Sequence, residues 1–370
     1  MSWKKFSTSF RNRTMRLLEK ILGRKVLSSV AVNLSAIDRI LVIRQHDQLG
    51  DFLLATPVLR ALREHFPQSH ITVLVRGYTR EAALHNEYIN DVIYLPESGY
   101  NYSLGWLREF WKKLRRRYEL AVVLNTVSHS LSSDILSHLS RSKFVLGSAH
   151  RIFPGCQRNF FYSFLAPYDA VEKHQTERNL DIVRYLGIDT RDRSEVMTIT
   201  EEERNWAVQF LRDNGLTAGL QPIGIHPGAG KIENRWQVEK FAEVAGYWFQ
   251  ASYMPVLFWG PKEVELGQML LSQVNFKPIV CDGLALRQFA AIVQQMEIFL
   301  CNDTGVMHVA AAVGTPLVAI FGPTEPSLWK PLGERFRVVR TSDRDCHSVT
   351  VDMVLDMMKT LLPKIDILPD

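Results

Sequence analysis

Residues 300–326 read LCNDTGVMHVAAAVGTPLVAIFGPTEP, and this stretch predicts two buried strands joined by a helix, with a polar turn after each strand. The run Ile298–Cys301 is short and apolar, as in a buried strand, whereas Val306–Val313 is rich in alanine and helical in period. The four residues NDTG between them therefore form a turn, in which Asp303 or Thr304 can cap the helix.

This turn is suited to binding a phosphate group. Backbone N–H groups at a helix N-terminus point outward, and the positive end of the helix dipole adds roughly 0.3 to 2 kcal/mol for an anion. Asp303, Thr304 and Gly305 would then lie at the ligand, with His308 one turn inside the helix and facing it. The same spacing is also typical of a capped helix in which Gly305 serves packing and His308 is a core histidine.

Length and composition bound the fold class. A chain of 370 residues suits two domains, each large enough to bury a core without disulfides. The composition is that of an ordinary globular protein, and no apolar run approaches the roughly 20 residues of a membrane span. The cysteines show neither paired spacing nor matched histidines, which argues against a zinc site or a disulfide framework and for reduced thiols in the cytoplasm. They are Cys156, Cys281, Cys301 and Cys346.

The basic character of the chain belongs to its amino-terminal arm. Residues 1–37 hold eight Lys or Arg and one acid, Glu19, and therefore carry a charge of +7. Since the whole chain carries +5, the remaining residues carry 5 − 7 = −2. Aromatic and aliphatic residues interleave with these cations, as in an amphipathic helix on an anionic membrane surface. A helix packed on the body of the protein and an arm that binds nucleic acid are the alternatives, of which nucleic acid is the weakest.

Short β-rich runs alternate with helical patterns along the rest of the chain, which predicts two doubly wound α/β domains. The charged helix Glu201–Asp213 and the turn after it place the boundary near residue 215, giving domains 38–215 and 216–370. The first series of runs is Ile40–Ile43, Ile71–Val75, Val92–Leu95 and Leu120–Leu124. The second is Ile223–His226, Val256–Trp259, Pro278–Val280, Ile298–Cys301, Leu317–Phe321 and Phe336–Val339.

The unusual polar residues follow these strands, where ligands bind in open parallel sheets. Two facing sheets would bring the loops into one cleft. No strand is followed by G-x-G-x-x-G or by a Walker A sequence, so dinucleotide oxidoreductases and P-loop enzymes are disfavoured.

The pattern D-T-G-x-x-H-x-A-A, followed by G-x-P-x-V-A-x-F-G-P-T, resembles the signature of glycosyltransferase family 9, the heptosyltransferases of lipopolysaccharide core assembly. The segments ILVIRQHDQLGDFLLATPVLRALREHFP, residues 40–67, and GIHPGAGKIENRWQVEKF, residues 224–241, resemble other parts of that family. The resemblance covers roughly residues 38–340. It implies the GT-B architecture, in which two Rossmann-like domains face each other and bind the acceptor in the first and the donor in the second.

The resemblance implies that Asp51 is the general base for the acceptor hydroxyl. One carboxylate can suffice, because a nucleotide diphosphate leaves as a stabilised anion and needs no protonating acid. The alternative for Asp51 is a helix cap, worth roughly 1 kcal/mol. Arg44, His46 and Gly50 are expected on the acceptor side, although the turn is one residue longer than the usual family form and carries His46 and Asp47.

The same resemblance implies that Lys231 and Arg235 meet the donor diphosphate, and Gly228 and Gly230 permit close backbone approach. Trp236 is expected to pack in the core. The segment FWGPKE, residues 258–263, resembles the strand end that carries a ribose-binding acid; Glu263 is the better match and Glu265 its rival. Thr324 and Glu325 are expected to shape the same cleft.

These expectations describe an inverting glycosyltransferase that moves heptose from ADP-heptose to a lipopolysaccharide core or related glycan. No cofactor or metal is implied. The D-x-D pattern at Asp343–Asp345 is interpreted as a chance match in a late loop away from the other motifs. The enzyme would be cytoplasmic, peripheral on the inner membrane. The alternatives are another nucleotide sugar as donor, or a non-catalytic nucleotide-sugar sensor or membrane scaffold.

Overall fold

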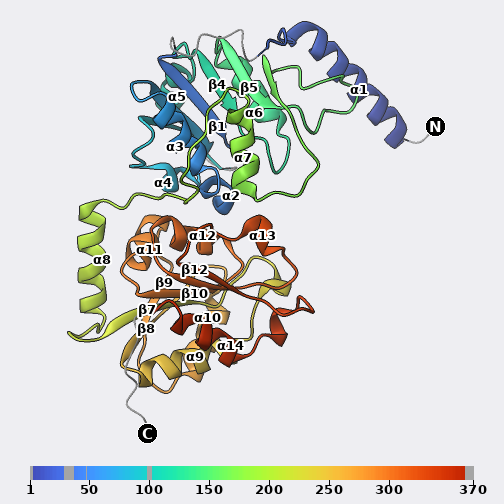
Figure 1. Ribbon diagram of the computed structural model, residues 1–370. Helices are drawn as coiled ribbons and strands as arrows, with labels where there is room; N and C mark the ends of the chain where they lie inside the picture. Colours follow the sequence, from blue (N-terminus) through green and yellow to red (C-terminus); the bar gives the residue numbers. More distant parts are fainter. Residues whose placement is uncertain (1–2, 29–36, 47, 98–101, 363–370) are drawn as a thin grey trace. The chain divides into compact units, whose positions relative to one another are not determined.

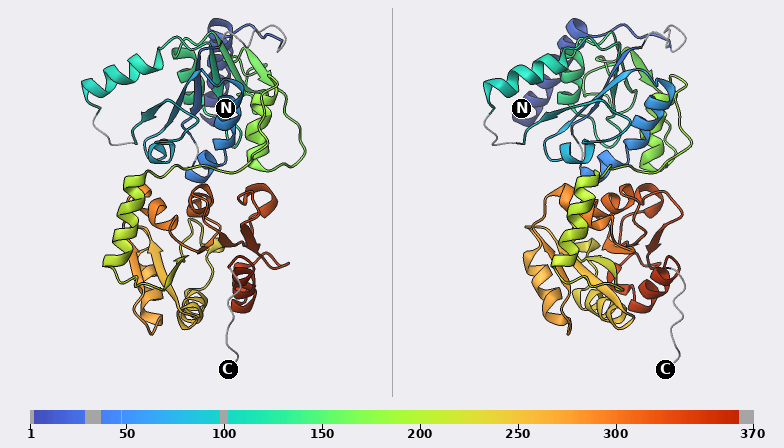
Figure 2. Two further views of the ribbon diagram at one scale, coloured as in Figure 1. Left: turned by 60° about the vertical axis from the view of Figure 1, so that its left-hand side comes forward. Right: turned by 90° about the vertical axis from the view of Figure 1, so that its left-hand side faces the viewer.

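The computed structural model describes residues 3–28, 37–46, 48–97 and 102–362, with residues 3–11 described as helix backbone. The chain divides into two compact units, Met1–Asp192 and Arg193–Asp370. In each unit a parallel sheet lies between helices (Figure 1, Figure 2). Within the described residues, no helix combines the length and the apolar character that a membrane span requires.

The described part of the first unit has a six-stranded sheet in the order β3-β2-β1-β4-β5-β6. Every described pair of neighbours is parallel, and β1 is buried except at Arg39, as expected for a strand covered on both faces. The strands are β1 (Arg39–Arg44), β2 (His70–Arg76), β3 (Asp91–Leu95), β4 (Leu120–Val123), β5 (Phe144–Ser148) and β6 (Phe164–Ala166). The helices are α1 (Trp3–Leu22), α2 (Leu49–Leu53), α3 (Thr56–His65), α4 (Arg80–Ala83), α5 (Leu104–Leu114), α6 (Leu131–Leu139) and α7 (Gln175–Arg184).

The second unit repeats this arrangement, with six described strands in the order β12-β11-β10-β7-β8-β9. The strands are β7 (Gln221–His226), β8 (Tyr253–Trp259), β9 (Ile279–Asp282), β10 (Ile298–Asn302), β11 (Leu317–Ile320) and β12 (Phe336–Val339). The helices are α8 (Glu201–Asp213), α9 (Val238–Gln250), α10 (Val264–Gln273), α11 (Leu286–Val293), α12 (Gly305–Ala312), α13 (Pro326–Trp329) and α14 (Val351–Lys359). Short 3₁₀ turns cover Ile232–Asn234 and Cys346–Ser348.

In both sheets the strand order reverses at the centre, between β1 and β4 and between β7 and β10. In doubly wound folds, ligands bind outside the carboxyl ends of the strands at such a reversal. The fold therefore places the turns after β1, β7 and β10 where a ligand site is expected.

All ten predicted strands are present, and the predicted pair of doubly wound α/β units is confirmed. The sequence missed β5 and β6, because β5 ends in Gly-Ser and β6 has three residues. The compact units divide between Asp192 and Arg193, before α8, whereas the sequence placed the boundary near residue 215, after that helix. Helix α8 groups with the second unit because it packs on α11.

The arm forms the predicted helix, α1, and packs on the first unit. Met15 is buried in the core of that unit, and Leu18 and Leu22 pack against the same cluster. The Nε–H of Arg16 donates to the carbonyl of Gly155 at 2.9 Å. Packing on the body, one of the alternatives for this segment, is therefore found for residues 12–22.

The ion pair between Glu203 of α8 and Arg287 of α11 gives a pH-dependent stability. Both guanidinium donors Nε and Nη2 bind the Glu203 carboxylate. The hydrogen bond from Arg287 lowers the pKa of Glu203 from its ordinary 4.5 to about 2, against an opposing effect of burial. A carboxyl whose folded pKa is depressed contributes stability above its unfolded pKa, and that contribution is lost as the pH falls toward the folded value.

Glu203→Gln is therefore expected to lower the free energy of unfolding at neutral pH by about 1 kcal/mol, since the pair is partly exposed to solvent. The difference between variant and wild type should shrink as the pH falls below about 4.5. Urea unfolding at several pH values measures it. Glu202→Gln, on the exposed side of the same turn, is the control. An equal difference at neutral and acidic pH would contradict the ion pair.

Candidate active site

The turn between β10 and α12 has no side chain that caps the N-terminus of α12. Thr304 occupies the N-cap position in extended conformation, but its side chain makes no cap hydrogen bond. The Oδ2 of Asp303 instead accepts from the Nδ2–H of Asn234 at 2.9 Å. The capping role that the sequence allowed for either residue is therefore not formed, and the helix N-terminus keeps its anion-binding character.

Two asparagines join three turns of the second unit. Asn234 donates to Asp303 and, at 3.4 Å, to the hydroxyl of Thr324 after β11. Asn302 donates to the carbonyl of Pro227 at 2.7 Å and accepts from the backbone N–H of Trp236 at 3.1 Å. The glycine-rich turn after β7 is thus fixed against the turns after β10 and β11.

The glycines of these turns serve two different purposes. At Gly322 a Cβ would lie 2.8 Å from the carbonyl oxygen of Glu233, so a glycine is needed for the turns to pack together. At Gly230 and Gly305 a Cβ would meet no atom within 4 Å. The backbone at these two positions therefore borders open space that a ligand can enter.

The acid Asp303 at the turn after β10 lies within reach of positive charge. Burial raises the pKa of Asp303, while the Thr324 hydrogen bond and the charges of His308 and Lys231 act in the opposite direction. Because Lys231 is exposed and acts electrostatically on Asp303, its charge reaches the predicted phosphate turn. A cation at this place offsets the repulsion that Asp303 would exert on an anionic ligand.

Glu263 lies against the glycine-rich turn. Its Oε2 accepts from the backbone N–H of Gly260 at 3.1 Å and lies 3.2 Å from Nε2 of His226. Burial alone would raise the pKa of Glu263, but the hydrogen bonds from His226 and Gly260 and the charge of Arg235 hold it below its ordinary value. A Cβ at Gly228 would overlap the carboxylate of Glu263.

The three remaining residues predicted for this edge, Glu265, Arg235 and Glu325, have different positions. Glu265, the rival acid, is exposed in the first turn of α10 and makes no hydrogen bond or ion pair with the glycine-rich turn among the described residues. The Nε–H of Arg235 donates to the carbonyl of Ala229 at 2.9 Å, so this side chain braces the same turn. Glu325 forms an ion pair with Arg340 at 3.0 Å beside the turn after β11.

His308 is paired with an acid that sequence reasoning missed. Its Nδ1 lies 2.9 Å from Oε1 of Glu195, and both side chains are buried. Burial raises the pKa of Glu195, and the neighbouring His308 acts against that rise. The segment of Glu195 is fixed to α12 a second time, since the N–H of Met197 donates to the carbonyl of Ala312. The pair therefore holds the His308 ring in one orientation.

Two expectations about neighbouring segments have different outcomes. Trp236 is buried, and its indole N–H donates to the carbonyl of Val349, so the packing role is confirmed. The loop of Asp343–Asp345 was expected away from the other motifs, and this is wrong. The thiol of Cys346 bonds to the carbonyls of Glu233 and Arg235, because the loop packs on the turn after β7. Hydrogen bonds from Ser348 and Thr341 lower the pKa of Asp343 to about 2, which ties this carboxylate into its own loop.

In the first unit, Asp51 is the third residue of α2, after the end of β1. Its Oδ2 accepts from the backbone N–H of Gln48 at 3.0 Å, in a capping box whose N-cap is Gln48. The residue is half-buried. Asp51 therefore contributes to a helix cap and stands at the predicted catalytic position at the same time.

The expected acceptor-side residues differ in exposure. Arg44 is buried and binds the carbonyls of Leu124 and Asp51, so it ties the end of β4 to the turn of the predicted base. Gly50 is buried inside α2, and His46 is exposed. Asp47 lies outside the described residues.

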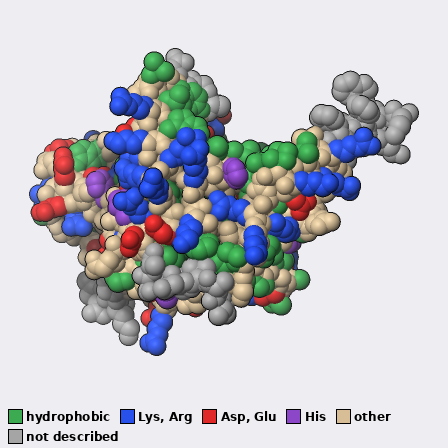
Figure 3. Space-filling model, turned by 90° about the horizontal axis from the view of Figure 1, so that it is seen from above, with side chains coloured by type: hydrophobic (Ala, Val, Ile, Leu, Met, Phe, Trp, Pro, Cys, Tyr) green, Lys and Arg blue, Asp and Glu red, His purple; other side chains and the backbone are tan. Residues whose placement is uncertain are grey.

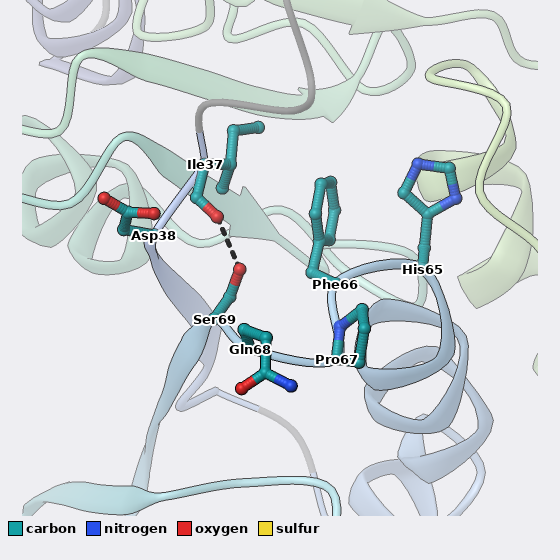
Figure 4. A pocket seen from close by; sticks show the side chains of 7 residues that line it. All are labelled: Ile37, Asp38, His65, Phe66, Pro67, Gln68 and Ser69. Carbon is teal, nitrogen blue, oxygen red and sulfur yellow. Dashed lines mark hydrogen bonds between the residues drawn. The ribbon is translucent and has the colours of Figure 1, made fainter.

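A hollow of about 360 Å³ in the first unit lies at the other edge of the sheet. It is lined by residues 37–38 and 65–69, which precede β1 and β2 (Figure 4). The hydroxyl of Ser69 donates to the carbonyl of Ile37 across it (Figure 4). Since it opens at the amino ends of the strands and contains none of the predicted site residues, it is separate from the candidate active site.

The model of glycosyltransferase family 9 (heptosyltransferase) matches residues 107–355. Lipopolysaccharide heptosyltransferase 2 of Escherichia coli (strain K12) is 28% identical over 312 residues, which cover 79% of this chain and 85% of that protein. A family 9 glycosyltransferase from Veillonella parvula DSM 2008 is 27% identical, with 88% of this chain and 97% of that chain covered at a TM-score of 0.77.

The E. coli heptosyltransferase WaaC, solved with ADP, shares the fold at a TM-score of 0.69 and 20% identity, with 87% of this chain and 99% of that chain covered. The two described sheets and their helices thus have the GT-B type of architecture. The family model spans more than half of the chain, from α5 to α14, and includes the glycine-rich turn after β7 and the turn after β10. The protein is a glycosyltransferase and belongs to glycosyltransferase family 9, the heptosyltransferases.

Proposed function

We propose that this protein transfers heptose from ADP-heptose to a lipopolysaccharide core or a related surface glycan, with inversion at the anomeric carbon. One observation carries the proposal: the turns after β7, β10 and β11 are joined by Asn234 around the N-terminus of α12, beside the cation Lys231. Such an arrangement suits a diphosphate. The name of the E. coli relative, a lipopolysaccharide heptosyltransferase, supports the choice of sugar and acceptor.

In the proposed reaction Asp51 accepts the proton of an acceptor hydroxyl. The hydroxyl oxygen forms a bond to the anomeric carbon from the face opposite the diphosphate, and the bond from that carbon to the β-phosphate oxygen breaks. ADP leaves with the bonding electron pair. Lys231, His308 and the end of α12 stabilise the charge that develops on the diphosphate, and Glu263 is placed to accept a hydrogen bond from the ribose.

Binding of ADP, UDP and GDP to the wild-type protein, measured by calorimetry with and without magnesium, tests the donor. We expect ADP to bind at least about tenfold more tightly than the other two, because the proposed donor is ADP-heptose. Magnesium should have little effect, because protein cations and N–H groups meet the diphosphate. Preference for UDP or GDP would overturn ADP-heptose as donor. Binding without turnover of ADP-heptose in the presence of core acceptor would favour a nucleotide-sugar sensor.

We also propose that the enzyme works on the cytoplasmic face of the inner membrane, held there by its basic arm. Arg13, Arg16 and Lys20 are exposed on α1, and Leu17 and Ile21 are exposed beside them. An amphipathic helix with this composition binds surfaces of anionic lipid. The lipid-linked acceptor would then be presented where the enzyme is concentrated.

A further inference from the structure

Helix α1 carries two separate apolar stripes over its described side chains. Met15, Leu18 and Leu22 recur at helical spacing and pack on the first unit. Leu17 and Ile21 lie on another side and are 57% and 67% exposed. A helix that only packed on the body would need the first stripe alone. The second stripe is therefore available for a different apolar surface.

A groove runs between α1 and the loop of residues 155–158. Its volume is about 790 Å³, and it is lined by Arg16, Glu19, Lys20, Gly155, Cys156, Gln157 and Arg158. Figure 3 shows the first unit from above, with basic and apolar side chains close together where α1 extends to the right. On one side the groove borders the exposed stripe, because Lys20 of its lining is three residues from Leu17, and residues at that spacing are neighbours on a helix surface.

The two walls of this groove are fixed to each other. Arg16 donates to the carbonyl of Gly155 at 2.9 Å, and the N–H of Gln157 donates to Oε2 of Glu19 at 3.2 Å. Gly155 has a φ of +95°, and a Cβ there would come within 2.8 Å of the carbonyl of Asn12. Only glycine permits this approach of loop and helix. The shape of the groove is therefore fixed by hydrogen bonds and by close packing within the first unit.

Its lining is basic. Three cations, Arg16, Lys20 and Arg158, line it together with one acid, Glu19. The carboxylate of Glu19 already accepts a hydrogen bond from the backbone N–H of Gln157. The Nη2–H of Arg158 donates to the carbonyl of Arg24 at 2.5 Å, while its Nη1 is buried without a hydrogen-bond partner among the described residues. An anion in the groove would offset the repulsion among the three cations.

We propose that this groove binds the phosphate of an anionic phospholipid headgroup while Leu17 and Ile21 enter the boundary of the acyl chains. The inference rests on the proposed membrane location and makes it specific to one site. Arginine and lysine supply charge-assisted hydrogen bonds to a phosphate. The adjoining apolar stripe distinguishes a lipid from a free phosphate, which would leave that stripe in water.

The test is flotation of the full-length protein with vesicles of phosphatidylcholine, with and without phosphatidylglycerol. Arg16→Gln with Lys20→Gln is expected to weaken binding to the anionic vesicles about 20- to 40-fold, since each cation near the surface is worth about 1 kcal/mol. The control is Arg212→Gln with Lys277→Gln, which removes the same charge from exposed positions of the second unit. It should change binding by less than about threefold.

Equal losses in the groove variant and the control would overturn the headgroup site and leave only a general electrostatic attraction. Leu17→Gln with Ile21→Gln should weaken vesicle binding as well. If that variant binds unchanged and millimolar inorganic phosphate displaces the wild type, the groove is a phosphate site that does not require lipid, and the proposal is overturned. Failure of the wild type to float would contradict the membrane location itself. Sugar transfer to a detergent-dispersed acceptor, measured in parallel, reports separately on the proposed reaction.

Discussion

Asp51→Asn is expected to lower the rate of sugar transfer by about 10² to 10⁴ while ADP affinity stays within about twofold of wild type. The physical reason is that an amide cannot accept the proton of the acceptor hydroxyl at neutral pH. The proposed donor cluster lies in the second unit, on β7, β10, β11 and the turns after them, so the change leaves it intact. Initial rates with ADP-heptose and core acceptor, together with calorimetry, measure the two quantities.

The asparagine variant separates catalysis from capping. Asp51 accepts from the N–H of Gln48, and an asparagine keeps an oxygen at that place, whereas Asp51→Ala removes it. The alanine variant is expected to lose about 0.5 to 2 kcal/mol of stability, and the asparagine variant less. A near-normal rate for the asparagine variant, with a stability loss only for alanine, would leave Asp51 with the cap alone.

Lys231→Ala is expected to weaken ADP binding about 10- to 100-fold. A hydrogen bond to a charged group is worth about 1.5 to 3 kcal/mol, and Lys231 is an exposed cation whose charge acts on Asp303 at the predicted phosphate turn. Calorimetric titration without magnesium measures the loss. Because the charge is needed most as the diphosphate departs, the transfer rate should fall as well.

Lys277→Ala is the matched control for Lys231. Lys277 is exposed and precedes β9, so it lies at the amino edge of the same sheet, away from the turns that follow the strands. Its replacement should leave ADP affinity within about twofold of wild type. If the two variants bind ADP alike, the diphosphate does not lie at Lys231.

The sequence predicted the fold well, because buried parallel strands are continuous apolar runs that need no knowledge of their partners. Ile40–Ile43 and Leu317–Phe321 are such runs, and both are strands. The first strand is one residue longer than its run at each end, and the second ends one residue earlier. Strand β5 was missed because its last two residues, Gly147 and Ser148, are typical of a turn. There a Cβ on Gly147 would collide with the ring of Tyr162, so tertiary packing, which a local pattern does not contain, selects the glycine.

The site was predictable where a turn follows a strand, and less so where side chains bond across the sheet. Asn234 and Asp303 are 69 residues apart, and His308 and Glu195 are 113 apart. Neither pair has a local signature. Glu195 did have a signal in the sequence, since Met197 and Ile199 alternate with Thr198 and Thr200, and Glu195 continues the row of Met197 and Ile199, all three of which are buried. An acid in such a row requires a buried partner, and His308 is that partner.

The close approach of Glu263 to Gly228 restricts how the proposed donor site can be altered in the laboratory. Any side chain at position 228 would displace the carboxylate that holds the N–H of Gly260 and lies beside His226. In a library that randomises this pocket, replacements of Gly228 should therefore survive only together with a shorter residue at position 263. The two positions act as a single unit of sequence change, and redesign of donor choice has to begin with both.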